Sequence, residues 1–406
     1  MSQAGCLVAV AAVVALFGQP TYAAQDVAWK EQAGSGKNNW STLASSNDGT
    51  KLVAAANAGS IYTSADSGVT WKEQTVTGLA GPQKWTAVAS SADGTKLAAF
   101  YQWGGYMYTS NDSGVTWMKN GLPGAAGDWV SATSSADGAK LAAVGRNSKV
   151  YTSENSGATW KEQANPGAKN WSSIASSDDG TKLAATVTDG SIYTSTDSGV
   201  TWKEQTSSGT KKWSAIASSA DGAKLVATVN GGRVYTSTDS GATWKEQDTA
   251  DRAWTAVASS ADGTKLAATV TDGSIYTSDD GGATWTESEN TGPNAWTAIA
   301  MSATGDKLAA ALNGGNIRTA TAKDKPVTPP APTPSPAPAP TPAPAPEPAP
   351  AAEPAPAATP ATETAAPAKH EEPTLADTGD SVWLVAALAA SGLGAGSFWF
   401  VKSRKS

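Results

Sequence analysis

Residues 64–71 read Ser64-Ala65-Asp66-Ser67-Gly68-Val69-Thr70-Trp71, and this octapeptide decides the fold. Its pattern of Ser, Asp, Gly, Thr and Trp returns with the same spacing around Asp112, Asp197, Asp239 and Asp280. A short Asp side chain can accept hydrogen bonds from backbone N–H groups of a turn, and Gly tolerates a positive φ. The octapeptide therefore predicts a tight turn, covered by the Trp ring, that recurs along the chain.

Two copies depart from the pattern. Asn155 takes the Asp position in one copy, and Gly281 replaces the usual Ser in another. Asn can still form the same turn, whereas an amide could not replace a catalytic carboxylate. We therefore interpret the whole set as structural: Asp66, Asp112, Asn155, Asp197, Asp239 and Asp280.

Two series of tryptophans measure the period of the repeat. Of the 17 Trp in 406 residues, 14 fall into two series of seven, with members spaced 41 to 46 residues apart. A period near 42 residues is typical of four-stranded propeller blades. The first series is Trp40, Trp85, Trp129, Trp171, Trp213, Trp254 and Trp296, and the second is Trp29, Trp71, Trp117, Trp160, Trp202, Trp244 and Trp285.

One unit, residues 171–205, divides into four short strands. Residues 171–175, 182–187, 191–195 and 201–205 are the predicted strands, and Asp179-Gly180 and Asp189-Gly190 are the predicted turns between them. Nothing in the unit has a helical period.

The first and last copies are complementary fragments. Residues 26–32 hold only the outer-strand part, whereas residues 296–320 hold the first three strands and end without the octapeptide. We therefore predict an all-β fold, a seven-bladed propeller of four-stranded blades over residues 25–322, in which the N-terminal strand completes the last blade. Such closure protects the sheet edges. A linear solenoid is the alternative, but it would call for distinct capping repeats, and none is visible.

The octapeptide resembles the Asp-box of bacterial-neuraminidase repeats. Families with this motif include sialidases, two-domain xyloglucanases, sortilin-type receptors and photosystem II assembly-factor propellers, and the resemblance implies their propeller fold. Sialidases of this group bind the substrate carboxylate with three Arg and use a Tyr-Glu pair with an acid Asp. Here the folded part has only Arg146, Arg233, Arg252 and Arg318, which are scattered along the repeats. The resemblance therefore extends to the fold and not to sialidase activity.

The composition excludes several kinds of chemistry. The only histidine, His370, and the only cysteine, Cys6, lie outside the predicted propeller. Ser-His-Asp and Cys-His catalytic systems, His- or Cys-ligated metal sites and intrachain disulfides are therefore not expected, nor is any cofactor. The net charge of -7 argues against nucleic acid, whose binding needs a basic surface.

A glycoside hydrolase would need two carboxyls in different environments beside a cleft. Most acids recur from one repeat to the next, so symmetry gives them equal surroundings. Asp128, Asp248 and Asp251 do not recur and are the remaining candidates, although solvated loop residues are commoner at such positions. We expect a non-enzymatic protein; a glycosidase acting on polysaccharide and a purely structural surface coat are the alternatives.

Two features could form a ligand surface on the face of the inter-blade loops. The seven Trp of the Trp40 series either surround one mouth of the ring or pack between blades, which is the commoner use of Trp. In the second repeat an insertion carries Tyr101, Trp103 and Tyr106, between the longest inter-blade loops. Exposed aromatics with hydroxyl and amide groups suit sugar or peptide recognition, and local repacking of one hairpin is the alternative.

Both ends of the chain carry export and anchoring patterns. Residues 1–24 have the layout of a signal peptide, with cleavage after Ala23 or Ala24. Residues 323–374 are expected to form a disordered Pro- and Ala-rich stalk, because 18 of the 23 prolines lie within this segment. In residues 375–406 an apolar span at 382–401 is followed by a basic tail, which predicts one transmembrane helix in the precursor.

The last 32 residues resemble a Gram-positive cell-wall sorting signal. Their first five, Leu375-Ala376-Asp377-Thr378-Gly379, resemble the Leu-Ala-x-Thr-Gly variant of that signal. The resemblance implies that a sortase cleaves between Thr378 and Gly379 and links Thr378 to peptidoglycan; a plain membrane anchor is the alternative. We therefore predict a secreted, wall-anchored propeller that presents a glycan- or protein-binding surface.

Overall fold

The computed structural model describes residues 26–323, apart from residues 80, 103–105 and 123–126. The predicted signal peptide, stalk and sorting signal, and Trp103, lie outside the described residues. Within them the regular elements are β-strands and two short 3-10 turns, η1 (Ala33–Ser35) and η2 (Thr206–Ser208). Neither of these helices is long and apolar enough to cross a membrane. The all-β prediction is confirmed.

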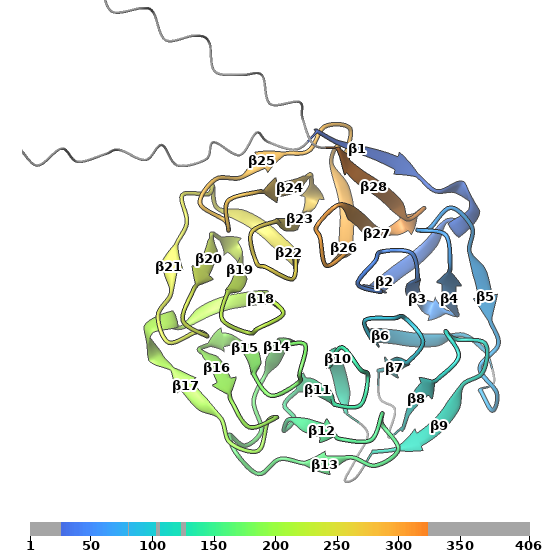
Figure 1. Cartoon of the computed structure of the whole chain (residues 1–406), viewed down its shortest axis with the longest axis horizontal. Coiled ribbons are helices and arrows are strands. Elements are labelled where there is room, and N and C mark those ends of the chain that lie inside the picture. The colour runs from blue at the N-terminus through green and yellow to red at the C-terminus, as the bar shows by residue number, and fades with distance from the viewer. Residues whose placement is uncertain (1–25, 80, 103–105, 123–126, 324–406) are drawn as a thin grey trace, which may run out of the picture. The chain divides into compact units, whose positions relative to one another are not determined.

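Consecutive strands pair antiparallel into four-stranded meanders, called blades here, which surround a common centre (Figure 1). In each blade the first strand lies innermost and the fourth lies at the rim. Blade one is β2 (Asn38–Ser45), β3 (Leu52–Gly59), β4 (Ile61–Ser64) and β5 (Lys72–Gln74). Blade two is β6 (Gln83–Ser90), β7 (Leu97–Tyr101), β8 (Tyr106–Ser110) and β9 (Met118–Gly121). Blade three is β10 (Asp128–Ser134), β11 (Leu141–Arg146), β12 (Tyr151–Ser153) and β13 (Lys161–Glu162).

The next three blades repeat this order. Blade four is β14 (Trp171–Ser176), β15 (Leu183–Gly190), β16 (Ile192–Ser195) and β17 (Lys203–Gln205). Blade five is β18 (Lys211–Ser218), β19 (Leu225–Gly232), β20 (Val234–Ser237) and β21 (Lys245–Glu246). Blade six is β22 (Arg252–Ser259), β23 (Leu266–Gly273), β24 (Ile275–Ser278) and β25 (Thr286–Glu287).

The closing blade combines the two ends of the described chain. Its first three strands are β26 (Asn294–Met301), β27 (Lys307–Gly315) and β28 (Arg318–Lys323), and its fourth is β1 (Asp26–Glu31). β1 pairs antiparallel with β28, from Asp26 opposite Lys323 to Glu31 opposite Arg318 (Figure 1). The predicted pairing of the two complementary fragments is confirmed.

Strand pairing also joins neighbouring blades. β15 runs through the predicted turn Asp189-Gly190, because its end pairs with β18 of the next blade: Thr188 lies opposite Lys212 and Gly190 opposite Lys211. The pairs β3–β6, β19–β22, β23–β26 and β27–β2 repeat this ladder. Blade three is different within the described residues: its four strands form a separate sheet, which a single bridge between Ser148 and Lys169 joins to blade four. The regular ladder is therefore interrupted at this blade.

A circle of backbone hydrogen bonds links the turns between first and second strands. Each N–H donates to the carbonyl of the equivalent residue in the next blade, at 2.7 to 2.8 Å, and the last residue donates back to the first. Because the circle returns to its start, it ties the blades together all round the centre. In chain order the residues are Asn47, Ala92, Ala136, Asp178, Ala220, Ala261 and Ala303.

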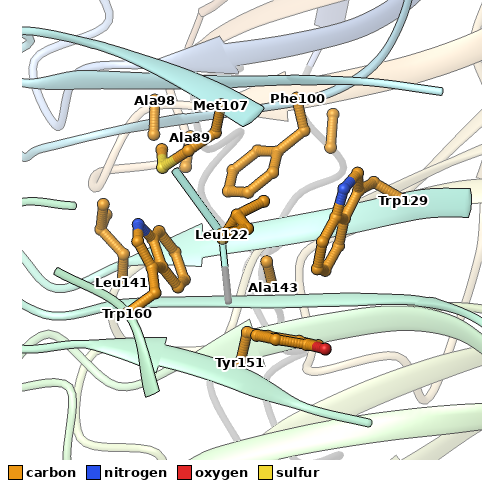
Figure 2. Close-up of a cluster of buried hydrophobic side chains, with 11 residues drawn as sticks. Ala89, Ala98, Phe100, Met107, Leu122, Trp129, Leu141, Ala143, Tyr151 and Trp160 are labelled. Carbon is orange, nitrogen blue, oxygen red and sulfur yellow. The ribbon is translucent and has the colours of Figure 1, made fainter. Parts of the chain in front are cut away.

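The hydrophobic cores lie between adjacent blades. The second strands contribute alanines with no exposed surface, including Ala54, Ala143 and Ala227, and such small side chains let neighbouring sheets approach closely. Figure 2 shows the core between blades two and three, where Phe100 lies 5.7 Å from the ring centroids of both Trp129 and Trp160. Large aromatic rings therefore fill the space between these two blades.

Candidate functional site

The turns formed by the octapeptides, called box turns here, are built by hydrogen bonds to one side chain. In blade two, Asp112 Oδ1 accepts bonds from the Ser110 hydroxyl and the Thr116 N–H, both at 2.8 Å, and Oδ2 accepts the Thr116 hydroxyl at 2.6 Å. These bonds lower the pKa of Asp112, and the bond from the Thr116 hydroxyl contributes most to this shift. In blade three, Asn155 accepts the Thr159 N–H at 2.8 Å and donates its own amide to the Thr159 hydroxyl. Both side chains therefore hold the turn by the same kind of backbone hydrogen bond.

Each box turn also packs on the preceding blade. Gly114 has a φ of +88°, and a Cβ there would lie 2.7 Å from the Thr63 methyl group of blade one. Trp117 covers the turn, and its Nε1 donates to the Gly114 carbonyl at 2.9 Å. The motif therefore joins blades.

The innermost-strand tryptophans form no aromatic mouth. All seven are 0 to 1% exposed. Trp85 Nε1 donates to the Gly59 carbonyl at 3.1 Å, and Trp171 Nε1 donates to the Ser148 carbonyl at 2.9 Å, so each ring is wedged against the preceding blade. A buried ring offers no face to a ligand. The predicted binding role is therefore wrong for Trp40, Trp85, Trp129, Trp171, Trp213, Trp254 and Trp296, and the packing alternative is observed.

The non-recurring acids are divided between two blades and are ion-paired. Asp128, in blade three, lies 3.1 Å from Arg146 and accepts a bond from Gln102 at 3.0 Å. Asp248 and Asp251, in blade five, lie 3.7 and 3.4 Å from Arg233. The structure therefore does not bring these three carboxylates into one cleft. The arginines are likewise separated, since Arg252 lies over Tyr276 in blade six and Arg318 lies over Trp296 in the closing blade.

Two adjacent carboxyls in blade four have opposite pKa shifts. Partial burial, followed by the charge of Asp179, raises the pKa of Asp178. Hydrogen bonds from Ser177 and Thr181 lower the pKa of Asp179 to about 2. Opposite shifts characterise acid–base pairs, but Asp179 Oδ1 is occupied by the Ser177 hydroxyl at 2.6 Å and the Thr181 N–H at 2.9 Å. Five other blades carry Ala at the Asp178 position: Ala92, Ala136, Ala220, Ala261 and Ala303.

Of the three aromatic residues predicted from the insertion in blade two, the structure shows one, Tyr106, exposed. Tyr106 is 44% exposed, and Lys119 Nζ lies 3.6 Å from the centre of its ring. Tyr101 is half-buried and packs edge-on against Trp85, with ring centroids 5.7 Å apart. Trp103 lies outside the described residues. The structure therefore brings Lys119 to this site, which the sequence analysis missed.

The exposed apolar side chains also gather on blade two. The described residues have five large hydrophobic side chains with high exposure. Val69, Val115 and Val200 hold the same box-turn position in blades one, two and four, whereas Tyr106 at 44% and Met118 at 55% are exposed in blade two alone. In blades one and four the position of Met118 carries Lys72 and Lys203. We call Tyr106, Met118 and Lys119 the blade-two edge. A comparison of the outer strands of the repeats, residue by residue, would have found it.

Blade three holds a charged pocket of about 410 Å³. Asp128 and Arg146 line one part of it, and Lys149, Glu162 and Tyr151 line another. Lys149 Nζ lies 2.5 Å from Glu162 Oε1, and the Tyr151 hydroxyl donates to Glu162 Oε2 at 2.6 Å. These contacts, that of Lys149 first, lower the pKa of Glu162. Burial, followed by the bond to Glu162, raises the pKa of Tyr151.

The charged side chains of the pocket keep hydrogen-bonding capacity that the described contacts do not use. Both oxygens of Asp128 accept bonds, from Gln102 and Arg146, and both oxygens of Glu162 accept bonds, from Lys149 and Tyr151. Arg146, whose side chain is 56% exposed, uses only one nitrogen for a contact within the described residues. A guanidinium carries five N–H donors. Arg146 therefore has N–H groups available for a ligand, and the carboxylates beside it can accept further bonds, since each carboxylate oxygen can accept two. No group of three or more His, Cys, Asp or Glu in the described part of the chain is placed to hold a metal ion.

Comparisons with known proteins place the chain among β-propellers. The profile of the DUF6242 beta propeller domain matches residues 136–256. No curated protein sequence matches the chain.

Solved structures share the fold at low sequence identity. "YCF48 bound to D1 peptide" is similar with a TM-score of 0.58 and 15% identity, over 74% of this chain and 97% of that one. YCF48 from Cyanidioschyzon merolae has a TM-score of 0.57 and 18% identity, over 72% and 98%. The GH74 xyloglucanase from Xanthomonas campestris has a TM-score of 0.56 and 16% identity, over 72% of this chain and 53% of that chain. These similarities show a β-propeller fold that is shared by a peptide-bound protein and by an enzyme.

Proposed function

We propose that the chain is a seven-bladed, non-enzymatic binding propeller that recognises a glycan or protein ligand on blades two and three. One observation carries the proposal: the repeat departs from its pattern on these two neighbouring blades, and the departures expose apolar side chains and a charged pocket. Ligand sites on repeat proteins are expected where sequence varies without breaking the repeat. The two blades are also linked directly, through the bond from Gln102 to Asp128.

The state of the carboxyls supports binding over hydrolysis. A glycosidase needs one carboxyl with a raised pKa opposite a second carboxylate. The two carboxyls of the blade-three pocket instead accept bonds from cations, and the pKa of Glu162 is lowered. Carboxylates held in this way suit the positioning of Arg146 and Lys149, whose remaining donors can bind a ligand.

A binding screen with two matched variants tests this role. The purified protein is applied to glycan, wall-polymer and peptide arrays, together with the double variant Arg146→Thr/Lys149→Ser and the control Arg233→Ser. Thr188 and Ser191 occupy the two positions in blade four, so the double variant keeps residues that this fold already accommodates. Arg233 occupies the Lys149 position in blade five, outside the pocket.

We expect the wild type and Arg233→Ser to bind the same ligand with equal affinity, and the double variant to bind about tenfold more weakly. The ligand should be recovered uncleaved. Release of product from a bound glycan would contradict the non-enzymatic role, and equal binding by all three proteins would place the ligand away from blade three.

We also propose that the propeller is displayed on the cell wall through Thr378. The support is the order of pentapeptide, apolar span and basic tail, all of which lie outside the described residues. Replacing Thr378 and Gly379 should make the protein extractable by detergent, whereas the wild type should need wall-lytic enzymes. Equal extraction of both forms would show a plain membrane anchor.

A further inference from the structure

We propose that β9, the outer strand of blade two, accepts an extended peptide as a fifth strand, and that the peptide alternates apolar and acidic residues. This inference rests on the proposed binding function and names one partner class for it. The outer strand of a meander directs every second N–H and C=O away from its neighbour, so it is a template for a further strand.

The outer strands of the blades differ in how well they are protected. β5 and β17 read Lys-Glu-Gln and β13 and β21 read Lys-Glu, and charged side chains on an edge strand oppose pairing with another chain. β9 reads Met-Lys-Asn-Gly and is four residues long, against two or three residues for the outer strands of blades one and three to six. Blade two therefore has the longest outer strand of these six blades. It carries one charged side chain, Lys119, as does the Thr-Glu strand of blade six, whereas the outer strands of the other four carry two.

The outer strand of blade two carries a positive residue at a position where the outer strand of blade four carries a negative one. The residue that faces the tyrosine of the third strand is Glu204 in blade four, opposite Tyr193, and Lys119 in blade two, opposite Tyr108. Lys119 contacts the Tyr106 ring, and no carboxylate pairs with it among the described residues. An acidic side chain directly across from Lys119 on an added strand would make an opposite-charge cross-strand pair.

The peptide should alternate apolar and acidic residues because the side chains of β9 alternate between the two faces of the sheet. Lys119 shares one face of the sheet with Tyr108 and Tyr106, whereas Met118 points to the other face, since neighbouring strand residues alternate. A strand that pairs with β9 therefore meets a cation on one face and an apolar side chain on the other. Peptide recognition by strand addition takes affinity from the backbone and specificity from such alternating contacts.

The test uses two synthetic octapeptides and the full chain. The first alternates Val and Glu, and the second alternates Val and Lys. Binding is measured by fluorescence anisotropy with the wild type, with Met118→Lys/Lys119→Glu, which restores the Lys-Glu of blades one and four, and with Lys203→Met/Glu204→Lys, which transfers the blade-two residues to blade four. Hydrogen exchange of the β9 amides is followed in parallel.

We expect the wild type to bind the Val-Glu peptide at least about tenfold more tightly than the Val-Lys peptide, with slower exchange of the β9 amides. The restored variant should lose this preference, and the transferred variant should gain a second site. Equal binding of both peptides, binding unchanged in the restored variant, or unprotected β9 amides in the complex would each overturn strand addition. If neither peptide binds while an array ligand still depends on Arg146 and Lys149, strand addition is wrong and the proposed binding function stands.

Discussion

Blade four and blade two are built on the same frame and present different surfaces. Trp171 and Trp85 each donate to a carbonyl of the preceding blade, and both box turns are held by an Asp. In blade four the outer strand carries Glu204, which accepts the Ser191 hydroxyl at 2.8 Å, whereas blade two carries Lys119 against Tyr106. The residues that recur in every blade form the ring. The residues of blade two that differ from the repeat form the proposed ligand surface.

The largest expected effect is one that the two blades share. Trp171→Ala and Trp85→Ala should each destabilise the protein by about 3 to 5 kcal/mol, because each removes a buried ring from an inter-blade core. Chemical denaturation of both variants checks this. A much smaller loss of stability for Trp85→Ala would show that Trp85 does not stabilise the contact between blades as Trp171 does.

The second prediction is a change in stability that should be opposite in blades two and four. Tyr108 is buried, and its hydroxyl has no hydrogen-bond partner among the described residues, whereas the hydroxyl of Tyr151 donates to Glu162. Lys119→Glu should supply the acceptor and stabilise the protein by about 1 kcal/mol. Glu204→Lys, the reverse change in blade four, should destabilise it, and thermal unfolding of both variants measures the difference. A loss of stability in Lys119→Glu would contradict the interpretation.

Much of this frame could be predicted from the sequence, because it repeats. The box turns and the closure by residues 26–32 follow from the spacing of Trp, Asp and Gly, which the fold imposes on every copy. The sequence left two positions open for the Trp40 series, a mouth of the ring or the space between blades. General Trp usage favoured the space between blades, but only the structure decides between the two. The insertion pointed to Tyr106, but Lys119 is separated from it by a turn and joins it only through the pairing of β8 with β9.

Acid titration should act equally on the two blades. Hydrogen bonds from Ser91 and Thr95 lower the pKa of Asp93 in blade two to about 2, and the equivalent bonds in blade four lower that of Asp179 to about 2. Because the folded pKa lies below the ordinary value of 3.8, the stabilisation is complete above about pH 4 and is lost as the pH falls to about 2. Asp93→Asn in the wild type and Asp179→Asn in an Asp178→Ala background, which gives both turns an alanine before the aspartate, should flatten the acid limb of the stability profile to the same extent. Unequal slopes would show that the two turns differ.

The smallest effect concerns the residue that distinguishes the blade-four turn. The pKa of Asp178 is raised in the folded state, so its charged form slightly opposes folding at neutral pH. Asp178→Ala introduces the residue of blade two, Ala92, and should leave the melting temperature unchanged or slightly higher. It should leave ligand binding intact. If Asp178→Ala loses binding, the ligand binds at the turns near the centre of the ring and not at blades two and three.

The central claim, that blade two departs from the repeat to bind and not to fold, is tested most directly on one variant. Met118→Lys/Lys119→Glu/Asn120→Gln gives blade two the outer strand of blade four, and its melting temperature and its affinity for the Val-Glu octapeptide are measured on the same sample. The account predicts a melting temperature equal to or above that of the wild type, with peptide binding weakened at least about tenfold. A lower melting temperature with unchanged peptide binding would contradict it.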